Sequence, residues 1–327
     1  MRHLFQGANA VTREIFLKRR IPLAVSWSLT HRCNQKCLYC GISNHSCAEL
    51  DTQKILNMIE DLRNMGMRWV SFTGGEPLLR EDLGQIAAFS KARGLYVSIS
   101  TNGRLVSERL NDLLCVDRVK LSLDGPRDIQ DTIKGEGSFD KVMEAIELCK
   151  KNKIPLCLEC VLSRYNIKSI DYLLRFASER GLKVIFQPAT EKILWQEELN
   201  PLAAPKDSYR GAISRLMNEK RRGAPVYNSL SGLRHLYSWP ESKSIRCSAG
   251  RLSFDIKPDG RILACDRIQR NFPGAKPSGV RDAVNNIPRP LDCKDCWRSS
   301  QVEFNLLSSL NPEAIFSFLA LGRNGSE

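Results

Sequence analysis

The sequence contains no run of eighteen apolar residues, so it provides no helix long enough to span a bilayer. Its first twenty residues, MRHLFQGANAVTREIFLKRR, also lack the apolar core of a secretory signal. Histidine is scarce, with four residues at scattered positions, which disfavours a histidine-ligated metal site. We therefore expect a cytoplasmic protein whose 327 residues bury one large core and a smaller appended unit.

Cysteine, by contrast, is abundant, with twelve residues. In a chain without an export signal we do not expect disulfides, because the cytosol keeps thiols reduced. Seven cysteines fall into two patterned groups, at residues 33, 37 and 40 and at residues 247, 265, 293 and 296, and ligation of a metal or cluster is the better interpretation of these seven. Cys47, Cys115 and Cys149 are interpreted as core or surface thiols. Cys157 and Cys160 lie three apart on a predicted strand and so face opposite sides, which makes a shared metal ion unlikely.

The net charge of +13 is unevenly placed along the chain. Residues 33–200 hold 23 basic and 23 acidic side chains, whereas residues 201–250 hold nine basic and three acidic ones. Such a basic region favours an anionic partner (a phosphorylated metabolite, nucleotide, acidic peptide or lipid headgroup), although a solvated basic surface explains it equally well. Nucleic acid is disfavoured, because the region lacks regularly interleaved aromatic and basic residues.

Strand-like runs alternate with amphipathic stretches from residue 24 onward. The predicted strands are 24–29, 68–73, 95–100, 118–123, 156–162 and 183–187, and the predicted helices are 51–66, 81–93, 106–114, 138–152 and 167–180. This alternation indicates an α/β fold with parallel strands and helical crossovers, either a doubly wound sheet or a partial barrel of TIM type. In both folds the functional loops follow the carboxyl ends of the strands.

The pattern changes beyond residue 190. A proline-containing basic connector with a helix at 206–222 is followed by a hairpin, RLSFDIKPDGRILAC, and a terminal helix starting near Asn311. We predict a basic extension at 1–21, a barrel at 22–190, the connector at 191–245 and a cysteine-bearing domain at 246–327. On the fifth strand Cys157 and Glu159 share a face, so both would approach a site if that face lined the barrel, but a core thiol and a paired carboxylate are favoured.

The first cysteine group lies in HRCNQKCLYC, directly after the first predicted strand. Cubane clusters are normally held by four thiolates, so three cysteines on one loop would leave one iron open. C-x3-C-x2-C with Tyr39 before the third cysteine resembles the radical S-adenosylmethionine (radical SAM) superfamily. The resemblance implies a partial (βα)6 barrel, a 4Fe–4S cluster on Cys33, Cys37 and Cys40, and Tyr39 near the adenine. It also implies that S-adenosylmethionine chelates the open iron and is cleaved to a 5′-deoxyadenosyl radical that abstracts hydrogen from substrate.

Three further motifs resemble the same superfamily in the same order. In TGGEP the resemblance implies that Gly74, Gly75 and Glu76 hold the methionine amine, and glycine permits the close backbone approach. In STNG and SLDG it implies that polar side chains meet the ribose and carboxylate. These are Asn102, Ser122 and Asp124, with Gln187 at the end of the sixth strand.

The second cysteine group, C-x12-G-x4-C followed by C-x2-C, resembles the auxiliary-cluster extension known as the SPASM domain. No cysteine follows residue 296, so the shortened twitch version is the better match, a small α+β extension. The resemblance implies an auxiliary 4Fe–4S cluster with a closed ligand set and an electron-transfer or structural role. Its ligands would be Cys247, Cys265, Cys293 and Cys296. A zinc ribbon is the alternative, although only one C-x2-C pair is present.

We therefore expect a radical SAM enzyme, oxidoreductase-like or a mutase or epimerase, acting on an anionic biosynthetic intermediate that is phosphorylated, nucleotide-linked or lipid-linked. The alternative substrate is a ribosomally made peptide, which is disfavoured because only about thirty residues precede the barrel and leave no room for a separate peptide-binding domain there. A non-catalytic iron–sulfur or zinc protein that binds nucleic acid is a third, weaker hypothesis. We expect a flavodoxin or ferredoxin as reductant, and the segment AIFSFLAL leaves peripheral membrane contact open.

Overall fold

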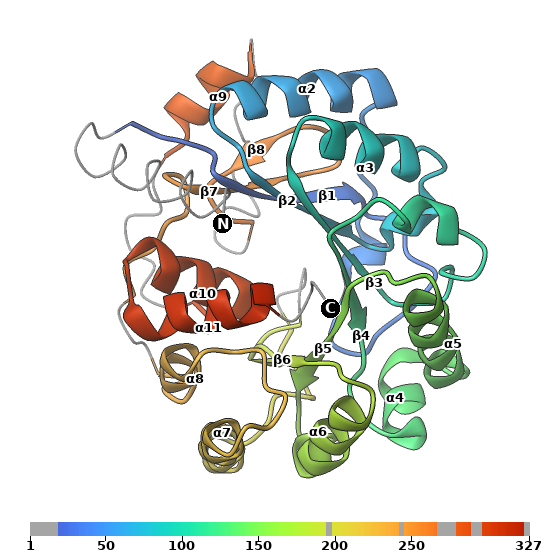
Figure 1. Ribbon diagram of the computed structural model, residues 1–327, viewed down its shortest axis with the longest axis vertical. Coiled ribbons are helices and arrows are strands. Elements are labelled where there is room, and N and C mark those ends of the chain that lie inside the picture. The colour runs from blue at the N-terminus through green and yellow to red at the C-terminus, as the bar shows by residue number, and fades with distance from the viewer. Residues whose placement is uncertain (1–18, 194–197, 242–244, 267–278, 289–295, 324–327) are drawn as a thin grey trace.

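The computed structural model describes residues 19–193, 198–241, 245–266, 279–288 and 296–323. Its centre is an eight-stranded sheet of order β6-β5-β4-β3-β2-β1-β7-β8, in which every neighbouring pair except β7 and β8 is parallel (Figure 1). The strands are β1 (Ala24–Thr30), β2 (Trp69–Gly74), β3 (Tyr96–Thr101), β4 (Arg118–Ser122), β5 (Leu156–Leu162), β6 (Val184–Pro188), β7 (Ser253–Ile256) and β8 (Ile262–Leu263). All six predicted barrel strands and the hairpin are confirmed.

Helices surround this curved sheet (Figure 1). They are α2 (Thr52–Asn64), α3 (Leu83–Ala92), α4 (Arg127–Lys134), α5 (Ser138–Lys151), α6 (Ile170–Glu179), α7 (Lys206–Arg221), α8 (Leu230–Leu236), α9 (Val280–Asn286), α10 (Ser299–Ser308) and α11 (Pro312–Arg323). The predicted helix at 106–114 is wrong, because this stretch forms turns and a short 3-10 helix, η3 (Leu110–Leu113). There Arg109 donates hydrogen bonds to the carbonyls of Leu78, Arg80 and Glu81, and these contacts hold the segment in a non-helical path.

The hydrophobic core lies between the sheet and the helices. In each parallel strand every second residue is apolar and buried on this outer face, as alternation along a pleated strand requires. The main examples are Val25 and Trp27, Val70 and Phe72, Val97 and Ile99, Val119 and Leu121, Leu158 and Cys160, Val184 and Phe186, and Phe254 and Ile256. Cys160 is therefore a core thiol.

The inner face of the sheet is polar and hollow. Closed α/β barrels usually fill this space with bulky branched side chains. Here the inward strand positions that line a cavity of about 310 Å³ carry mainly hydroxyl groups in the first four strands, and these groups are too small to fill the barrel. They are Ser26, Ser28, Ser71, Thr73, Ser100 and Ser122. The signal is visible in the sequence, since VSWS, VSFT and VSIS repeat one pattern in three strands.

A layer of large side chains lies near the amino ends of the strands, below the cavity. Arg118 at the start of β4 donates a hydrogen bond to the hydroxyl of Tyr227 and lies over its ring. Tyr96 and Cys157 interact electrostatically with the same guanidinium, and burial raises the pKa of the Cys157 thiol to about 11. None of these four side chains lines the cavity, so Cys157 is a buried thiol, as predicted.

Helix α10 connects β6 to β7 through hydrogen bonds. Figure 1 shows this helix beside α11. Ser299 donates a hydrogen bond to the carbonyl of Phe186 on β6. Further along the helix, the Gln301 amide donates to the Ser253 hydroxyl on β7 over 2.9 Å. The C-terminal hairpin itself extends the barrel sheet, because β7 pairs with β1. The predicted domain boundaries stay predictions, but the structure joins the cysteine-bearing segment to the barrel through this pairing.

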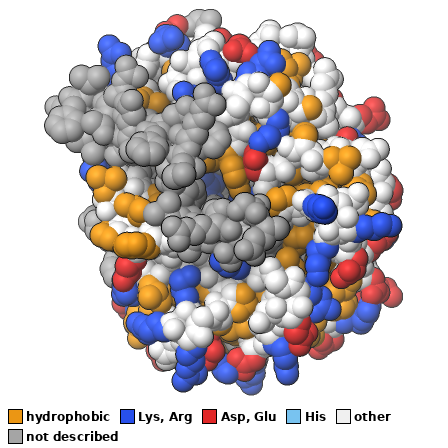
Figure 2. Space-filling model, viewed as in Figure 1, with side chains coloured by type: hydrophobic (Ala, Val, Ile, Leu, Met, Phe, Trp, Pro, Cys, Tyr) orange, Lys and Arg blue, Asp and Glu red, His pale blue; other side chains and the backbone are white. Residues whose placement is uncertain are grey.

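The basic segment 201–250 includes α7 and α8, and several of its charges are paired. Arg210 and Lys206 both contact Glu241, and Arg215 contacts Asp171 over 2.6 Å. On the described part of the face in Figure 2, Lys and Arg side chains are spread around the periphery and alternate with Asp and Glu. No described helix has the length and apolar character needed to cross a membrane.

Because the core lies on the outer face of the sheet, substitutions at two neighbouring residues of β2 should have very different effects on stability. Phe72→Ala should lower the free energy of unfolding by about 3–5 kcal/mol, because it leaves a hole in the outer layer. Ser71→Ala should change it by less than about 1 kcal/mol, because that side chain faces the cavity. Urea unfolding followed by circular dichroism measures both, and similar losses in the two variants would contradict a hollow barrel.

Candidate functional site

The cavity opens at the carboxyl ends of the parallel strands, and the first cysteine group lines it. The thiols of Cys33, Cys37 and Cys40 share this cavity with six of the eight residues predicted to bind S-adenosylmethionine. Those six are Tyr39, Gly74, Gly75, Asn102, Ser122 and Gln187. Residues that are separated by more than 150 positions in sequence therefore meet at one edge of the sheet, as the strand-end rule requires.

The three thiols are chemically suited to iron. Burial raises the pKa of Cys33 to about 11 and also raises the pKa of Cys37 and Cys40, so the metal-free loop holds neutral thiols. Bound iron would deprotonate them. A single tetrahedral zinc ion would hold its thiolate sulfurs about 4 Å apart, yet these three sulfurs are not among the described ligand groups that gather within 4.8 Å. This wider spacing fits a cluster better than one metal ion.

The chain segment that leads into the cysteine loop passes so close to residues 74 and 75 that both must be glycine. A Cβ at Gly75 would lie 2.1 Å from the carbonyl oxygen of Arg32, and one at Gly74 would lie 2.1 Å from that of Thr30. The backbone N–H of Gly75 donates to Thr30 over 2.8 Å, and Gly74 has a φ of 136°. Glycine is thus needed for close approach between two chain segments, and the predicted contact with the methionine amine stays a prediction.

Glu76 lies behind the glycines and does not line the cavity. Its carboxylate is fully buried and accepts hydrogen bonds from the Thr101 hydroxyl and from the backbone N–H groups of Asn102 and Leu78. Burial raises the pKa of Glu76 to about 7, although these three donors act in the opposite direction. The carboxylate therefore joins the ends of β2 and β3, and its predicted contact with the amine remains a prediction.

Asp124 also lies behind the cavity wall, in a buried group with Tyr39 and Lys134. The Asp124 carboxylate accepts hydrogen bonds from the Tyr39 hydroxyl over 3.0 Å and from the backbone N–H of Val161 over 2.8 Å. The Lys134 ammonium lies 3.4 Å from the same carboxylate. Burial alone would lower the pKa of Lys134, but Asp124 and the nearby thiol of Cys37 outweigh it and raise the pKa.

Sequence reasoning missed Lys134, which carries a buried positive charge beside the cysteine loop. Lys134 is the last residue of α4, a helix that was not predicted, and its side chain is 4% exposed. No spacing rule marks this lysine, because its partners lie on the cysteine loop and at the end of β4. A cation here offsets part of the negative charge that three thiolates would place in a buried site.

Asn102 and Gln35 hold the cysteine loop from two sides. The Asn102 amide lies 4.0 Å from the Cys33 sulfur and donates a 2.7 Å hydrogen bond to the Asn34 side chain. The Gln35 amide donates to Ser138 over 3.1 Å and accepts from the Cys37 thiol over 3.7 Å. Asn102 is therefore placed to orient a cysteine, and its predicted contact with the ribose stays a prediction.

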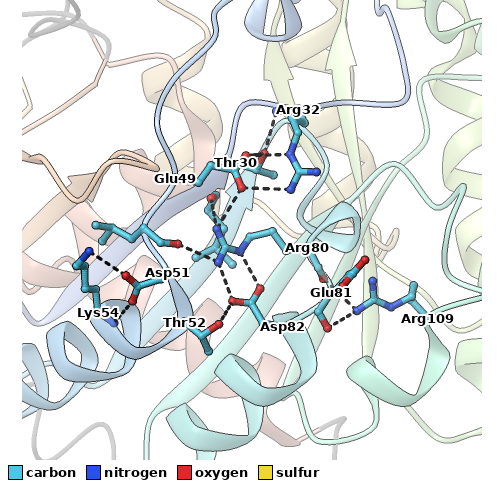
Figure 3. Close-up of polar contacts among 12 residues, drawn as sticks. Thr30, Arg32, Glu49, Asp51, Thr52, Lys54, Arg80, Glu81, Asp82 and Arg109 are labelled. Atoms are coloured by element: carbon cyan, nitrogen blue, oxygen red, sulfur yellow. Dashed lines mark hydrogen bonds and ion pairs between the residues drawn. The ribbon is translucent and has the colours of Figure 1, made fainter.

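A polar network fixes the back of the cysteine loop (Figure 3). The Glu49 carboxylate accepts hydrogen bonds from Thr30 and from Arg32, which directly precedes Cys33. It also pairs with Arg80, whose side chain is nearly buried and pairs with Asp82 over 2.7 Å. Hydrogen bonds from Arg32 and Thr30 outweigh burial and lower the pKa of Glu49, so the network is ionised at neutral pH.

The second cysteine group lies beside the cavity rather than in its lining. Cys247, Cys265 and Cys296 are all half-buried, while Cys293 lies outside the described residues. Their chain neighbours Asp266 and Arg298 do line the cavity. The three described thiols do not gather within 4.8 Å of one another.

One tight group of potential metal ligands was found among the described residues: Asp255, Cys265 and Asp266, within 4.8 Å of one another. Arg298 already pairs with both carboxylates, over 3.0 Å to Asp255 and 3.4 Å to Asp266. This guanidinium supplies the positive charge that a metal ion would otherwise bring. We therefore interpret the acidic pair as the partner of Arg298 and not as a metal site.

Comparison with known sequences identifies relatives. A family model of the radical SAM superfamily matches residues 27–177. Mycofactocin maturase MftC of Mycobacterium ulcerans (strain Agy99) is 30% identical over 256 residues, covering 75% of this chain and 68% of the maturase. PqqA peptide cyclase of Ruegeria pomeroyi (strain ATCC 700808 / DSM 15171 / DSS-3) is 29% identical, covering 75% and 67%. Fe-coproporphyrin III synthase of Methanosarcina barkeri (strain Fusaro / DSM 804) is 29% identical, covering 62% of this chain and about half, 48%, of the synthase.

Solved structures have the same fold. Streptococcus suis SuiB superposes with a TM-score of 0.69 at 15% identity, covering 85% of this chain and 69% of SuiB. The enzyme anSMEcpe with bound AdoMet superposes with a TM-score of 0.61 at 22% identity, covering 75% of this chain and 74% of that enzyme. These identities support the fold alone. Together with the sequence matches, they confirm the predicted superfamily resemblance and the partial barrel.

The contact at Gly75 predicts loss of the cluster in a variant with one extra methyl group. Gly75→Ala should push the cysteine loop away from β2, so the reconstituted variant should hold about four fewer irons per chain than wild type. Gly211→Ala is the matched control, since no atom lies within 4 Å of a Cβ there. Iron and sulfide assays after anaerobic reconstitution measure the effect. Full iron occupancy in a folded Gly75→Ala protein would contradict the role assigned to this glycine.

The raised pKa of Glu76 predicts a pH-dependent stability. The unfolded chain loses this proton near pH 4.5 but the folded chain keeps it to about pH 7, so the contribution of Glu76 to stability falls as pH rises through this window. The fall should be on the order of 1 kcal/mol per pH unit. Glu76→Gln removes this titration, so the advantage of wild type over the variant should shrink between pH 5 and pH 7.

Urea unfolding of the reduced, metal-free proteins at pH 5, 6 and 7 measures this difference. Glu144→Gln is the control, because that carboxylate is exposed and pairs with Lys141, which lowers its pKa. The difference between wild type and the control should therefore be flat over the same range. A wild-type advantage over Glu76→Gln that grows with pH would show that the carboxylate is ionised throughout.

Proposed function

The chain belongs to the radical SAM superfamily, and we propose that it modifies a residue of a peptide by hydrogen abstraction. When bound, the 4Fe–4S cluster and S-adenosylmethionine supply the electron and the radical that begin such a reaction. In this chain Cys33, Cys37 and Cys40 would hold the cluster. Tyr39, Gly74, Gly75, Asn102, Ser122 and Gln187, which line the same cavity, would contact S-adenosylmethionine.

The length of the sequence match to peptide-modifying relatives is the main support for a peptide substrate. The matches to mycofactocin maturase and PqqA peptide cyclase each cover 75% of the chain, whereas the superfamily model covers only residues 27–177. The similarity therefore extends beyond the part of the barrel that all members share. Because specificity depends on the parts that differ between members, we give these two relatives more weight than the superfamily match alone.

The size of the cavity also favours a substrate that inserts only a small group. Its volume of about 310 Å³ lies at the lower end of the range for small-molecule sites, and the cofactor would share it. A single residue at the tip of an extended peptide fits this space better than a whole tetrapyrrole, the substrate class suggested by the name Fe-coproporphyrin III synthase. The phosphorylated or lipid-linked intermediate expected from the sequence has less support, because the charged side chains that line the cavity are of both signs.

We further propose that the second cysteine group holds an auxiliary 4Fe–4S cluster that exchanges electrons with the substrate site. Cys265 precedes Asp266, and Cys296 lies two residues before Arg298, and both of these neighbours line the cavity. The group is therefore close enough to the cavity wall for an electron-transfer role. Reduction of the first cluster would come from a flavodoxin or ferredoxin.

The proposal is tested with the anaerobically reconstituted enzyme, S-adenosylmethionine and dithionite. Synthetic peptides encoded by short reading frames beside the gene serve as substrates, and iron coproporphyrin III serves as the competing candidate. We expect 5′-deoxyadenosine to form and one peptide to change mass in equal amount. Cys33→Ser should abolish both products, because it removes a cluster ligand.

Two outcomes would contradict the proposal. Conversion of iron coproporphyrin III with every peptide unchanged would replace the peptide by a tetrapyrrole. Failure to form any 5′-deoxyadenosine from a protein with full iron content would contradict the enzyme activity itself.

A further inference from the structure

Two charged side chains face each other inside the barrel, beneath the residues proposed to bind S-adenosylmethionine. Lys120 on β4 and Glu159 on β5 both line the cavity. In the strand register Glu159 lies opposite Ser122, and Lys120 lies one inward position deeper. A paired carboxylate is the interpretation that the sequence favours for Glu159, and this side chain does pair with Lys120 while also lining the cavity.

The pair is loosely joined. The Lys120 ammonium and the Glu159 carboxylate are 3.9 Å apart, and within the described residues this is the only polar contact that either charged group makes. Hydrogen-bonded ion pairs have N–O distances of about 2.7–2.9 Å. Both groups therefore keep hydrogen-bonding capacity: three N–H donors on the lysine and the acceptor positions of the carboxylate.

Other charges at the cavity are more firmly engaged. Arg298 lies 3.0 Å from Asp255 and also pairs with Asp266. Lys134 pairs with Asp124 and donates to the Tyr39 hydroxyl. Lys257 also lines the cavity, and it too has an interaction partner. The loosely held pair is thus the part of the wall with the clearest capacity for a new ligand.

We propose that Lys120 and Glu159 together bind an amide group of the substrate, an inference that rests on the proposed peptide substrate. The carbonyl oxygen of the amide accepts from Lys120, and its N–H donates to Glu159. The oxygen and nitrogen of an amide are about 2.3 Å apart, so one amide spans a pair separated by 3.9 Å with two hydrogen bonds of ordinary length. The source of the amide is an Asn or Gln side chain, because a primary amide presents its carbonyl oxygen and one N–H on the same side, whereas a trans peptide bond presents them on opposite sides.

Charge balance selects an amide over other groups. A substrate carboxylate would gain Lys120 but be repelled by Glu159, and a substrate amine would be repelled by Lys120. An aliphatic group would exclude water from both charges without offering hydrogen bonds in return, and burying charges in this way is costly. A neutral amide satisfies both charges and leaves their mutual attraction in place.

The test measures binding of blocked tripeptides, Ac-Gly-Xaa-Gly-NHCH3, whose C-terminal methylamide removes the primary amide from the blocking group, to the anaerobic holoenzyme loaded with S-adenosylmethionine. The variable residue is Asn, Gln, Ala, Asp, Leu or Lys, and competition saturation-transfer NMR gives the relative affinities. We expect the Asn or Gln peptide to bind about tenfold more tightly than the Asp, Leu and Lys peptides. An Ala peptide that binds as tightly as the Asn peptide would contradict recognition of a side-chain amide.

Single variants should switch the preference, which a merely structural role would not do. Glu159→Gln leaves the ammonium, so the Asp peptide should become the tightest ligand. Lys120→Met leaves the carboxylate, so the Lys peptide should become the tightest. The double variant Lys120→Glu with Glu159→Lys keeps a neutral pair and should again prefer the amide.

Lys141→Met and Glu144→Gln are matched controls, because this pair has the same residue types in an exposed position on α5. Neither control should alter the order of affinities. The inference is overturned if Leu binds as tightly as Asn, if no tripeptide binds, or if folded Lys120 and Glu159 variants keep the wild-type order. Modification of a complete precursor peptide tests the proposed function separately, so these failures would leave that function standing.

Discussion

The outward-facing side chains of the parallel strands pack against the surrounding helices, and the rest of this barrel depends on that contact. Trp27, Phe72 and Phe186 are fully buried in this outer layer. Since the layer already supplies a continuous core, the inward positions need not be apolar or large. Serines at these positions would be costly in a dry interior. Facing a cavity, they instead leave room for ligands.

The ends of the first three parallel strands form a second level of organisation, because they hold one another. Gly75 on the loop after β2 donates to Thr30, and Glu76 donates from its backbone to Arg32 on the cysteine loop. The Glu76 carboxylate in turn accepts from Asn102 after β3, and the Asn102 side chain donates back to Asn34. Many of the motif residues therefore form hydrogen bonds with one another, and these bonds hold the cysteine loop in place.

The strands could be predicted from sequence because alternation and turn residues are local signals. The motif positions could be predicted because strand ends meet at one edge of a parallel sheet. What could not be predicted is which motif side chain faces the cavity. Glu76 and Asp124 are withdrawn from it by backbone N–H groups of Asn102 and Val161, which belong to neighbouring strands or their end loops. Likewise, the segment 106–114 is held out of a helix by the contacts of Arg109 with carbonyls about thirty residues away.

The charged side chains around the cavity also differ in how tightly they are paired with opposite charges. Lys134 is held by Asp124 in a fully buried group, and separating the two would leave an uncompensated charge. Arg298 is similarly held between two carboxylates. Such groups can support a cofactor site but can exchange partners only at high cost. Lys120 and Glu159 are partly exposed to the cavity and 3.9 Å apart, so a ligand can enter between them at lower cost. Substrate selection is therefore expected where charge pairing is weakest, and cofactor support where it is strongest.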